Sequence, residues 1–235
     1  ALIDVNEEGL ATAAKQVEEA GGAALTLVGD VADPEAMVAL AARIEREVGP
    51  VQTLIPSAGI LQNAATVLEM DLEEYSRVWD INYHGTVYTV RAFAPNMTKR
   101  AQGVIVTIGS VNSFGALPLP AYCPGKTAIL RLTQILAVEL GRFGIRVNGV
   151  APGYVLTPAL KARIESGDRD ADMIRGAGAV NMNLYPENIA DVVAFLCSDK
   201  AAAVSGTMVP VDAGWEAATL YRSYAGGVPW EADGS

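Results

Sequence analysis

The sequence predicts a single-domain α/β fold, in which one parallel sheet lies between two layers of helices in a doubly wound order. Short apolar runs alternate with longer helical patterns along the 235 residues, which is typical of parallel strands joined by helical crossovers. The length suits one core, and about half of the residues are apolar, as in a globular domain. We expect this three-layer domain to span residues 1–214 and a glycine-rich, aromatic tail to span 215–235.

The first half of the chain alternates strand and helix. Ala1–Asp4 is expected to be the end of a buried strand that stops at a carboxylate. The helical pattern after it ends at Gly21-Gly22, because glycine favours a helix C-terminus. Asp33 resembles an N-cap with Pro34 at the first helical position. In chain order the expected elements here are strand 1–4, helix 7–20, strand 24–28, helix 34–48 and strand 51–55.

The second half continues the alternation, with one interruption. The segment 157–185 lacks clear periodicity and is longer than an ordinary connection, which favours a lid or substrate loop. Pro186-Glu187 opens the last long helix. In chain order the expected elements are helix 71–97, strand 103–108, helix 122–143, strand 145–150, helix 186–197 and strand 207–211.

Small and polar residues follow the expected strands at the point where each ends. In parallel sheets of this kind, ligands bind outside the carboxyl ends of the strands. We therefore expect these residues to line one crevice: Asp4, Asp30, Ser57-Ala58-Gly59, Ser110 and Pro152-Gly153.

Composition excludes several classes of function. The net charge of −10 argues against a nucleic-acid partner and against an anionic membrane surface, and no apolar run approaches the roughly 20 residues that span a bilayer. A single histidine, His84, excludes a histidine-cluster metal site, and we expect no metal. Two cysteines form no disulfide framework, which suits a reducing cytoplasm.

Tyr122 and Lys126 form the pair on which the chemistry depends. Four residues apart at the start of a helix, they share one face. An ammonium beside a phenol favours the phenolate, so we expect the pKa of Tyr122 to fall below its usual value of about 10. Such a phenol could exchange a proton with an oxygen near neutral pH. The alternative is a surface aromatic residue beside a solvated lysine.

Several motifs together resemble the short-chain dehydrogenase/reductase family, and the resemblance covers nearly the whole chain. The motifs are Y-C-P-G-K at 122–126, I-G-S at 108–110, D-I-N-Y-H-G around Asn82, D-V at 30–31, R-V-N-G-V-A-P-G-Y-V-L-T at 146–157 and P-E-N-I-A at 186–190. Their order and spacing agree jointly. The resemblance implies a Rossmann-like fold and a nicotinamide-dependent oxidoreductase.

The resemblance also implies roles for four catalytic residues. Tyr122 would be the general acid in carbonyl reduction and the base in alcohol oxidation. Lys126 would lower the tyrosine pKa and bind the nicotinamide ribose. Ser110 would donate a hydrogen bond to the substrate oxygen, and Asn82 would hold a water that links Lys126 to solvent. Asn82 could instead cap a local irregularity with no chemical role.

For the cofactor the resemblance implies NAD, preferred over NADP. The Asp4 carboxylate would accept hydrogen bonds from the adenosine ribose hydroxyls and would repel a 2′-phosphate. Each of the implied contact residues also has a plain reading as a turn or cap. Asp4 would contact the adenosine ribose, Asp30 and Val31 the adenine, Lys126 the nicotinamide ribose, and Val155 and Thr157 the nicotinamide carboxamide, while the protein backbone at Ala58 and Gly59 would approach the cofactor closely. The other implied cofactor-binding residues are Ser57, Tyr122, Pro152 and Gly153.

Two features depart from the family pattern. The first strand, its glycine-rich turn and the helix that it opens, which would cradle the pyrophosphate, are missing ahead of Ala1, and we expect about 30 further residues there. The N-A-G turn reads S-A-G, with Ser57 in place of the amide.

The leading interpretation is an oxidoreductase that acts on a carbonyl/secondary-alcohol pair. Two alternatives remain: an NADPH-dependent 3-oxoacyl-carrier-protein reductase, which Asp4 and the acidic balance disfavour, and a non-catalytic nucleotide sensor. The family implies a homotetramer. Apolar loop residues hint at an apolar small-molecule ligand, or else pack beneath a lid: Phe114, Leu117, Met173, Ile174, Met182 and Leu184.

Overall fold

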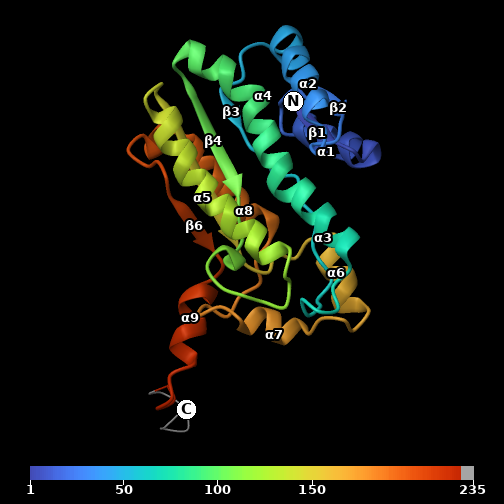
Figure 1. Ribbon diagram of the computed structural model, residues 1–235, viewed down its shortest axis with the longest axis vertical. Coiled ribbons are helices and arrows are strands. Elements are labelled where there is room, and N and C mark those ends of the chain that lie inside the picture. Colours follow the sequence, from blue (N-terminus) through green and yellow to red (C-terminus); the bar gives the residue numbers. More distant parts are fainter. Residues whose placement is uncertain (229–235) are drawn as a thin grey trace.

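The protein is a parallel α/β structure, described for residues 1–228 by a computed structural model (Figure 1). The strands are β1 (Leu2–Asp4), β2 (Thr26–Val28), β3 (Thr53–Leu54), β4 (Gly103–Ile108), β5 (Ile145–Pro152) and β6 (Met208–Val211). The helices are α1 (Glu7–Glu19), α2 (Pro34–Glu47), α3 (Leu72–Trp79), α4 (Gly85–Arg100), α5 (Tyr122–Gly141), α6 (Pro158–Glu165), α7 (Ala171–Gly176), α8 (Pro186–Cys197) and α9 (Trp215–Arg222). The predicted fold class is confirmed.

The sheet consists of two parallel parts. β1 pairs with β2, and the other four strands lie in the order β3-β4-β5-β6. A cavity of about 500 Å³ lies between the parts, and residues of β1 and β3 line it. The strand that ends at Asp4 was expected to be buried, but Leu2 and Ile3 are only half-buried because the cavity lies beside them.

Helices cover both faces of the four-stranded part. Side chains alternate along β4: Ile105 packs in a core cluster with Phe93 and Met97 of α4, whereas Val106 packs with Val193 of α8. Figure 1 shows α4 and α5 running beside β4, with α8 behind it. This alternation follows from the two-residue period of a strand. As a result, helices pack against both faces of β4.

Most predicted elements are confirmed, with shorter strands in the first half. Asp33 caps α2 as predicted, since its Oδ1 accepts hydrogen bonds from the Glu35 and Ala36 amides at 2.9 and 3.0 Å. The helix predicted over 71–97 is instead divided into α3, a π-helix at Asp80–His84 and α4. Among residues 1–228, no helix has both the length and the apolar character needed to cross a membrane.

The segment 157–185 and the start of the tail are more ordered than expected. The former contains α6 and α7, and the tail begins with α9. Asp212 accepts hydrogen bonds from the Gly214 and Glu216 amides, both at 2.8 Å. Trp215 stacks on Tyr154 at a centroid distance of 4.5 Å. The start of α9 therefore packs against the segment that follows β5.

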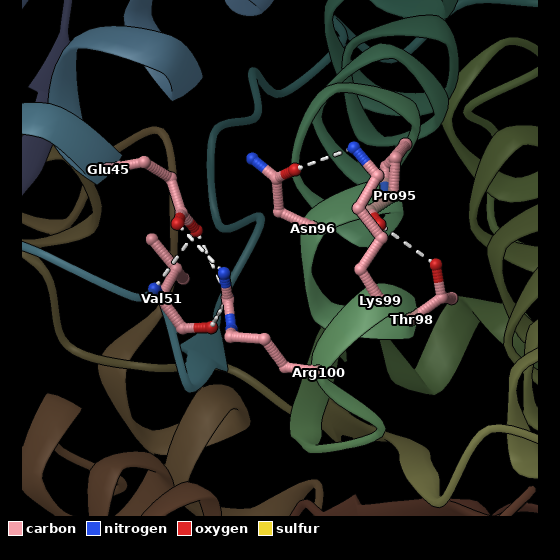
Figure 2. Close-up of polar contacts among 7 residues, drawn as sticks. All are labelled: Glu45, Val51, Pro95, Asn96, Thr98, Lys99 and Arg100. Carbon is pink, nitrogen blue, oxygen red and sulfur yellow. Dashed lines mark hydrogen bonds and ion pairs between the residues drawn. The ribbon is translucent and has the colours of Figure 1, made fainter.

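Arg100 at the end of α4 holds α2 and the segment just before β3 together (Figure 2). Its guanidinium donates to both carboxylate oxygens of Glu45, at 2.8 and 3.0 Å, and to the Val51 carbonyl at 2.9 Å. The Glu45 carboxylate also accepts from the Val51 amide at 3.1 Å. Partial burial would raise the pKa of Glu45, but the hydrogen bonds from Arg100 and Val51 outweigh it and lower the pKa.

Candidate active site

The first two turns of α5 carry Tyr122 and Lys126. Lys126 is 5% exposed, and its Nζ donates to the carbonyl of Ile108, the last residue of β4, at 2.9 Å. Nζ lies 5.5 Å from the centroid of the Tyr122 ring. The lysine therefore connects α5 to the end of β4.

Ser110 lies directly after β4, opposite the same helix. Its hydroxyl lies close enough to the phenol of Tyr122 to lower the pKa of that group, and it accepts a hydrogen bond from the Asn112 amide at 3.2 Å. Ser113, three residues on, donates through Oγ to the Lys126 carbonyl at 2.8 Å and accepts from the Ser110 amide at 3.3 Å. Ser113 thus fixes the turn at 110–113 to α5. Its position in the sequence did not suggest this role.

The pKa values of the pair differ from the prediction. Burial raises the pKa of Tyr122, and the nearby Cys123 adds to this, while the nearby Ser110 hydroxyl opposes it. Burial lowers the pKa of Lys126 to about 8. The expected fall in the tyrosine pKa is therefore wrong in this structure, because removal from water outweighs an ammonium whose hydrogen bond goes to Ile108.

Asn82 lies in the π-helix and is 2% exposed. Its Oδ1 accepts from the Ile60 amide at 2.7 Å, and its Nδ2 donates to the Ile60 carbonyl at 2.9 Å. The side chain therefore ties the helix to the loop after β3, which agrees with the structural alternative. The predicted role in holding water stays a prediction.

Gly59 passes between two of these groups. A Cβ atom at this position would lie 3.2 Å from Asn82 Oδ1 and 3.9 Å from Lys126 Nζ. The absent side chain thus lets the S-A-G turn approach both residues closely.

The residues predicted to bind a cofactor lie at or after the carboxyl ends of parallel strands. Asp4 and Asp30 are exposed, and each accepts one nearby amide, from Asn6 and Ala32, at 2.9 Å. Val31, Ser57 and Ala58 all border the cavity beside β1. Pro152 ends β5 and Gly153 follows it; Val155 bridges to Leu184, and the Thr157 hydroxyl caps α6.

The residues that hinted at an apolar ligand differ in burial, and Leu117 is half-buried. Ile174 and Leu184 are each 7% exposed, so they pack beneath the surface, as the alternative interpretation allowed. Met173 is 76% exposed, and Phe114 and Met182 are also exposed. Trp230 of the aromatic tail lies outside the described residues.

Gln62 was missed by the sequence analysis. It is 2% exposed, and its Oε1 accepts hydrogen bonds from the amides of Ala121 and Tyr122, at 2.8 and 3.1 Å. It lies in an irregular loop with no strand or helix period, so no sequence pattern marked it as buried.

Comparisons with known proteins show which proteins the chain resembles. A family model described as enoyl-(acyl carrier protein) reductase matches residues 1–216. Inactive 2-(S)-hydroxypropyl-CoM dehydrogenase 2 of Xanthobacter autotrophicus is 36% identical over 88% of this chain and 91% of that protein. Cis-4-hydroxycyclohexanecarboxylate dehydrogenase of Sinomonas cyclohexanicum is 33% identical over 89% and 84% of the two chains.

Solved structures resemble the protein over most of its length. A crystal structure named as ribose-5-phosphate isomerase from Brucella melitensis 16M has a TM-score of 0.88 at 35% identity, covering 96% of this chain and 85% of that one. A gluconate 5-dehydrogenase from Burkholderia cenocepacia J2315, in complex with NADP and tartrate, has a TM-score of 0.84 at 29% identity, covering 92% and 84%.

Proposed function

The chain belongs to the short-chain dehydrogenase/reductase family, an oxidoreductase family, and we propose that it transfers a hydride between NAD(H) and a carbonyl/secondary-alcohol substrate. The observation that carries this proposal is that Tyr122 and Lys126 lie together on α5, with Nζ 5.5 Å from the ring centroid, Lys126 buried and Ser110 close enough to influence the pKa of the phenol. A sensor without turnover would not need this arrangement.

The residues fit a nicotinamide cofactor by their chemistry. Asp4 presents an exposed carboxylate at the end of β1, suited to ribose hydroxyls. Lys126 offers a buried ammonium, and the missing side chain of Gly59 lets the backbone pass close to Lys126 and Asn82. Bound nicotinamide supplies the hydride donor or acceptor.

The protein's own residues would hold the substrate oxygen and move its proton. Ser110 donates to that oxygen as negative charge develops on it. Tyr122 protonates the oxygen during carbonyl reduction and removes the proton from the alcohol during oxidation. Lys126 holds the α5 face against the end of β4.

The two free cysteines suit a cytoplasmic location.

A panel assay followed by nicotinamide absorbance tests this function. Secondary alcohols with NAD, ketones with NADH and 3-oxoacyl thioesters with NADPH form its three arms. We expect turnover in the first two. Activity confined to the third arm would favour the carrier-protein reductase, and none in any arm, from folded protein that binds NAD, would favour the sensor.

We propose that Asp4 gives NAD its preference over NADP. A 2′-phosphate would meet a carboxylate, and no lysine or arginine follows within the next ten residues. Asp4→Ala should lower the ratio of kcat/KM for NAD to kcat/KM for NADP by about tenfold or more. A tenfold change corresponds to about 1.4 kcal/mol. Glu8→Ala, on exposed α1, is the control. An unchanged ratio would remove Asp4 from the cofactor site.

A further inference from the structure

The helix that carries Tyr122 begins without a capping side chain of its own. Its N-cap residue is Ala121, which offers no oxygen to the free amides of the first turn. The Cys123 amide is satisfied by the Leu119 carbonyl at 3.0 Å, and Pro124 has no N–H. The amides of Ala121 and Tyr122 therefore remain, and these are the two that Gln62 accepts.

The orientation of the Gln62 amide follows from these contacts. Only the carbonyl oxygen can accept from two N–H groups, so Oε1 faces α5. Nε2 is buried and has no hydrogen-bond partner among the described residues. A buried donor without a partner costs free energy, so its retention points to a task for the other end of the amide.

The loop around Gln62 contacts other parts of the site as well. The backbone N–H and carbonyl of Ile60 pair with the two ends of the Asn82 side-chain amide. The backbone amide and the side chain of Asn63 both donate to the Glu74 carboxylate of α3, at 3.0 and 2.9 Å. The segment 60–63 is thus anchored on two helices before it reaches α5. An anchored segment can set the position of the α5 N-terminus.

We propose that Gln62 is a positioning residue, which caps α5 from the loop after β3 and thereby holds the Tyr122 phenol against Ser110. This inference rests on the proposed role of Tyr122 in proton transfer. Since the capped amide belongs to Tyr122 itself, a shift of the helix start moves the phenol directly. A displacement of about 1 Å in a reacting group can lower a rate by about 100-fold.

The test compares Gln62→Leu, which removes the acceptor, with Gln62→Glu, which keeps it. For Gln62→Leu we expect amide hydrogen exchange at Ala121 and Tyr122 to quicken by about tenfold or more. We expect kcat to fall by about 10–100-fold with little change in the Kd for NAD. Gln62→Glu should restore slow exchange and most of kcat. Its carboxylate should move the rise of alcohol oxidation to higher pH, because a nearby negative charge disfavours the phenolate.

Asn148→Leu is the matched control. Asn148 is also a fully buried amide that ties loop backbone, through bonds to the Val204 carbonyl and the Thr207 amide at 2.8 and 3.3 Å. It should lower thermal stability without moving the pH profile or the exchange at α5. A Gln62→Leu protein with unchanged exchange, with unchanged kcat, or with a loss that Gln62→Glu does not rescue overturns the proposal. The exchange measurement needs no turnover, so it separates failure of the cap from failure of the proposed function.

Discussion

Burial, more than neighbouring charge, determines the protonation of Tyr122 and Lys126. The raised pKa keeps the phenol protonated at neutral pH, which suits it to donate a proton in carbonyl reduction. In the proposed mechanism, alcohol oxidation uses the phenolate of Tyr122, so the rate of oxidation should rise with pH. The four-residue spacing identified the pair correctly, but spacing alone cannot show how far two groups are removed from water.

Lys126 should make the free energy of unfolding depend on pH. Its ordinary pKa is 10.5, and burial lowers this pKa to about 8 in the folded protein. Between these values the unfolded chain binds a proton that the native protein has released, so stability rises with pH. The rise from about pH 8 to pH 10 should be on the order of 2 kcal/mol, as measured by urea unfolding.

Lys126→Met isolates this contribution, because every other group titrates alike in the two proteins. The raised pKa of Tyr122 lowers stability only above about pH 10, outside this window. An equal slope in wild type and Lys126→Met would show that the native lysine keeps its ordinary pKa.

At the residue level, the sequence predicted which candidate side chains lie together better than it predicted the contacts that hold them in place. Ser110, Tyr122 and Lys126 lie together as their motifs suggested. Gln62 and Ser113 could not be predicted, because each acts through backbone groups that are distant in sequence, 59 and 13 residues away. Such partners become visible only once the loops are folded.

Among the elements, the long helix 71–97 is the informative difference. Its apolar period predicted one helix, and the structure inserts a π-helix at Asp80–His84. One extra residue in a turn barely alters the pattern of apolar residues, so sequence periodicity cannot reveal it, and such turns are frequent at functional sites. The π-helix here carries Asn82.

Short helices were the other elements missed. α6 and α7 have 8 and 6 residues, too few for a helical period to stand out. Their capping residues, Thr157 and Asp170, could have marked them. In contrast, α5 with 20 residues was predicted from its length and apolar pattern.

The contact between α4, α2 and the segment just before β3 should make a measurable contribution to stability. Arg100 and Glu45 side chains are 29% and 17% exposed, so solvent screens their bidentate pair only partly. Arg100→Ala should lower the free energy of unfolding by about 1–3 kcal/mol. Lys99→Ala is the control from the same turn, since its 3.4 Å contact with Asn96 is exposed (Figure 2), and should change stability by less than about 0.5 kcal/mol. Equal effects of the two variants would contradict this assignment.

For the whole molecule, the order of strands and helices followed from the sequence, and the sheet divides into two parts where the family's first strand was expected, between the strands that end at Asp4 and near Ile55. Alternation of apolar runs specifies which segments are strands. Alternation does not specify which strands pair. β1 and β3 do not pair with each other, yet their apolar runs look like those of strands that are neighbours in the sheet.

Exposed apolar side chains support the proposed homotetramer. Leu220 and Tyr224, around the end of α9, are 80% and 70% exposed, and Val138 on α5 is 80% exposed. Surfaces of this kind often mark contacts between subunits. Light scattering at micromolar concentration should give four times the chain mass, and a monomer mass would contradict the proposal.

The most direct test of proton transfer by Tyr122 is the kcat of Tyr122→Phe for the best alcohol of the panel, measured beside the Kd for NAD. The substitution removes only the hydroxyl group. We expect kcat to fall by about 100- to 10,000-fold, with the Kd for NAD within about twofold of wild type. A near-normal kcat, with a substrate deuterium isotope effect showing that hydride transfer limits the rate, would contradict a proton-transfer role for Tyr122.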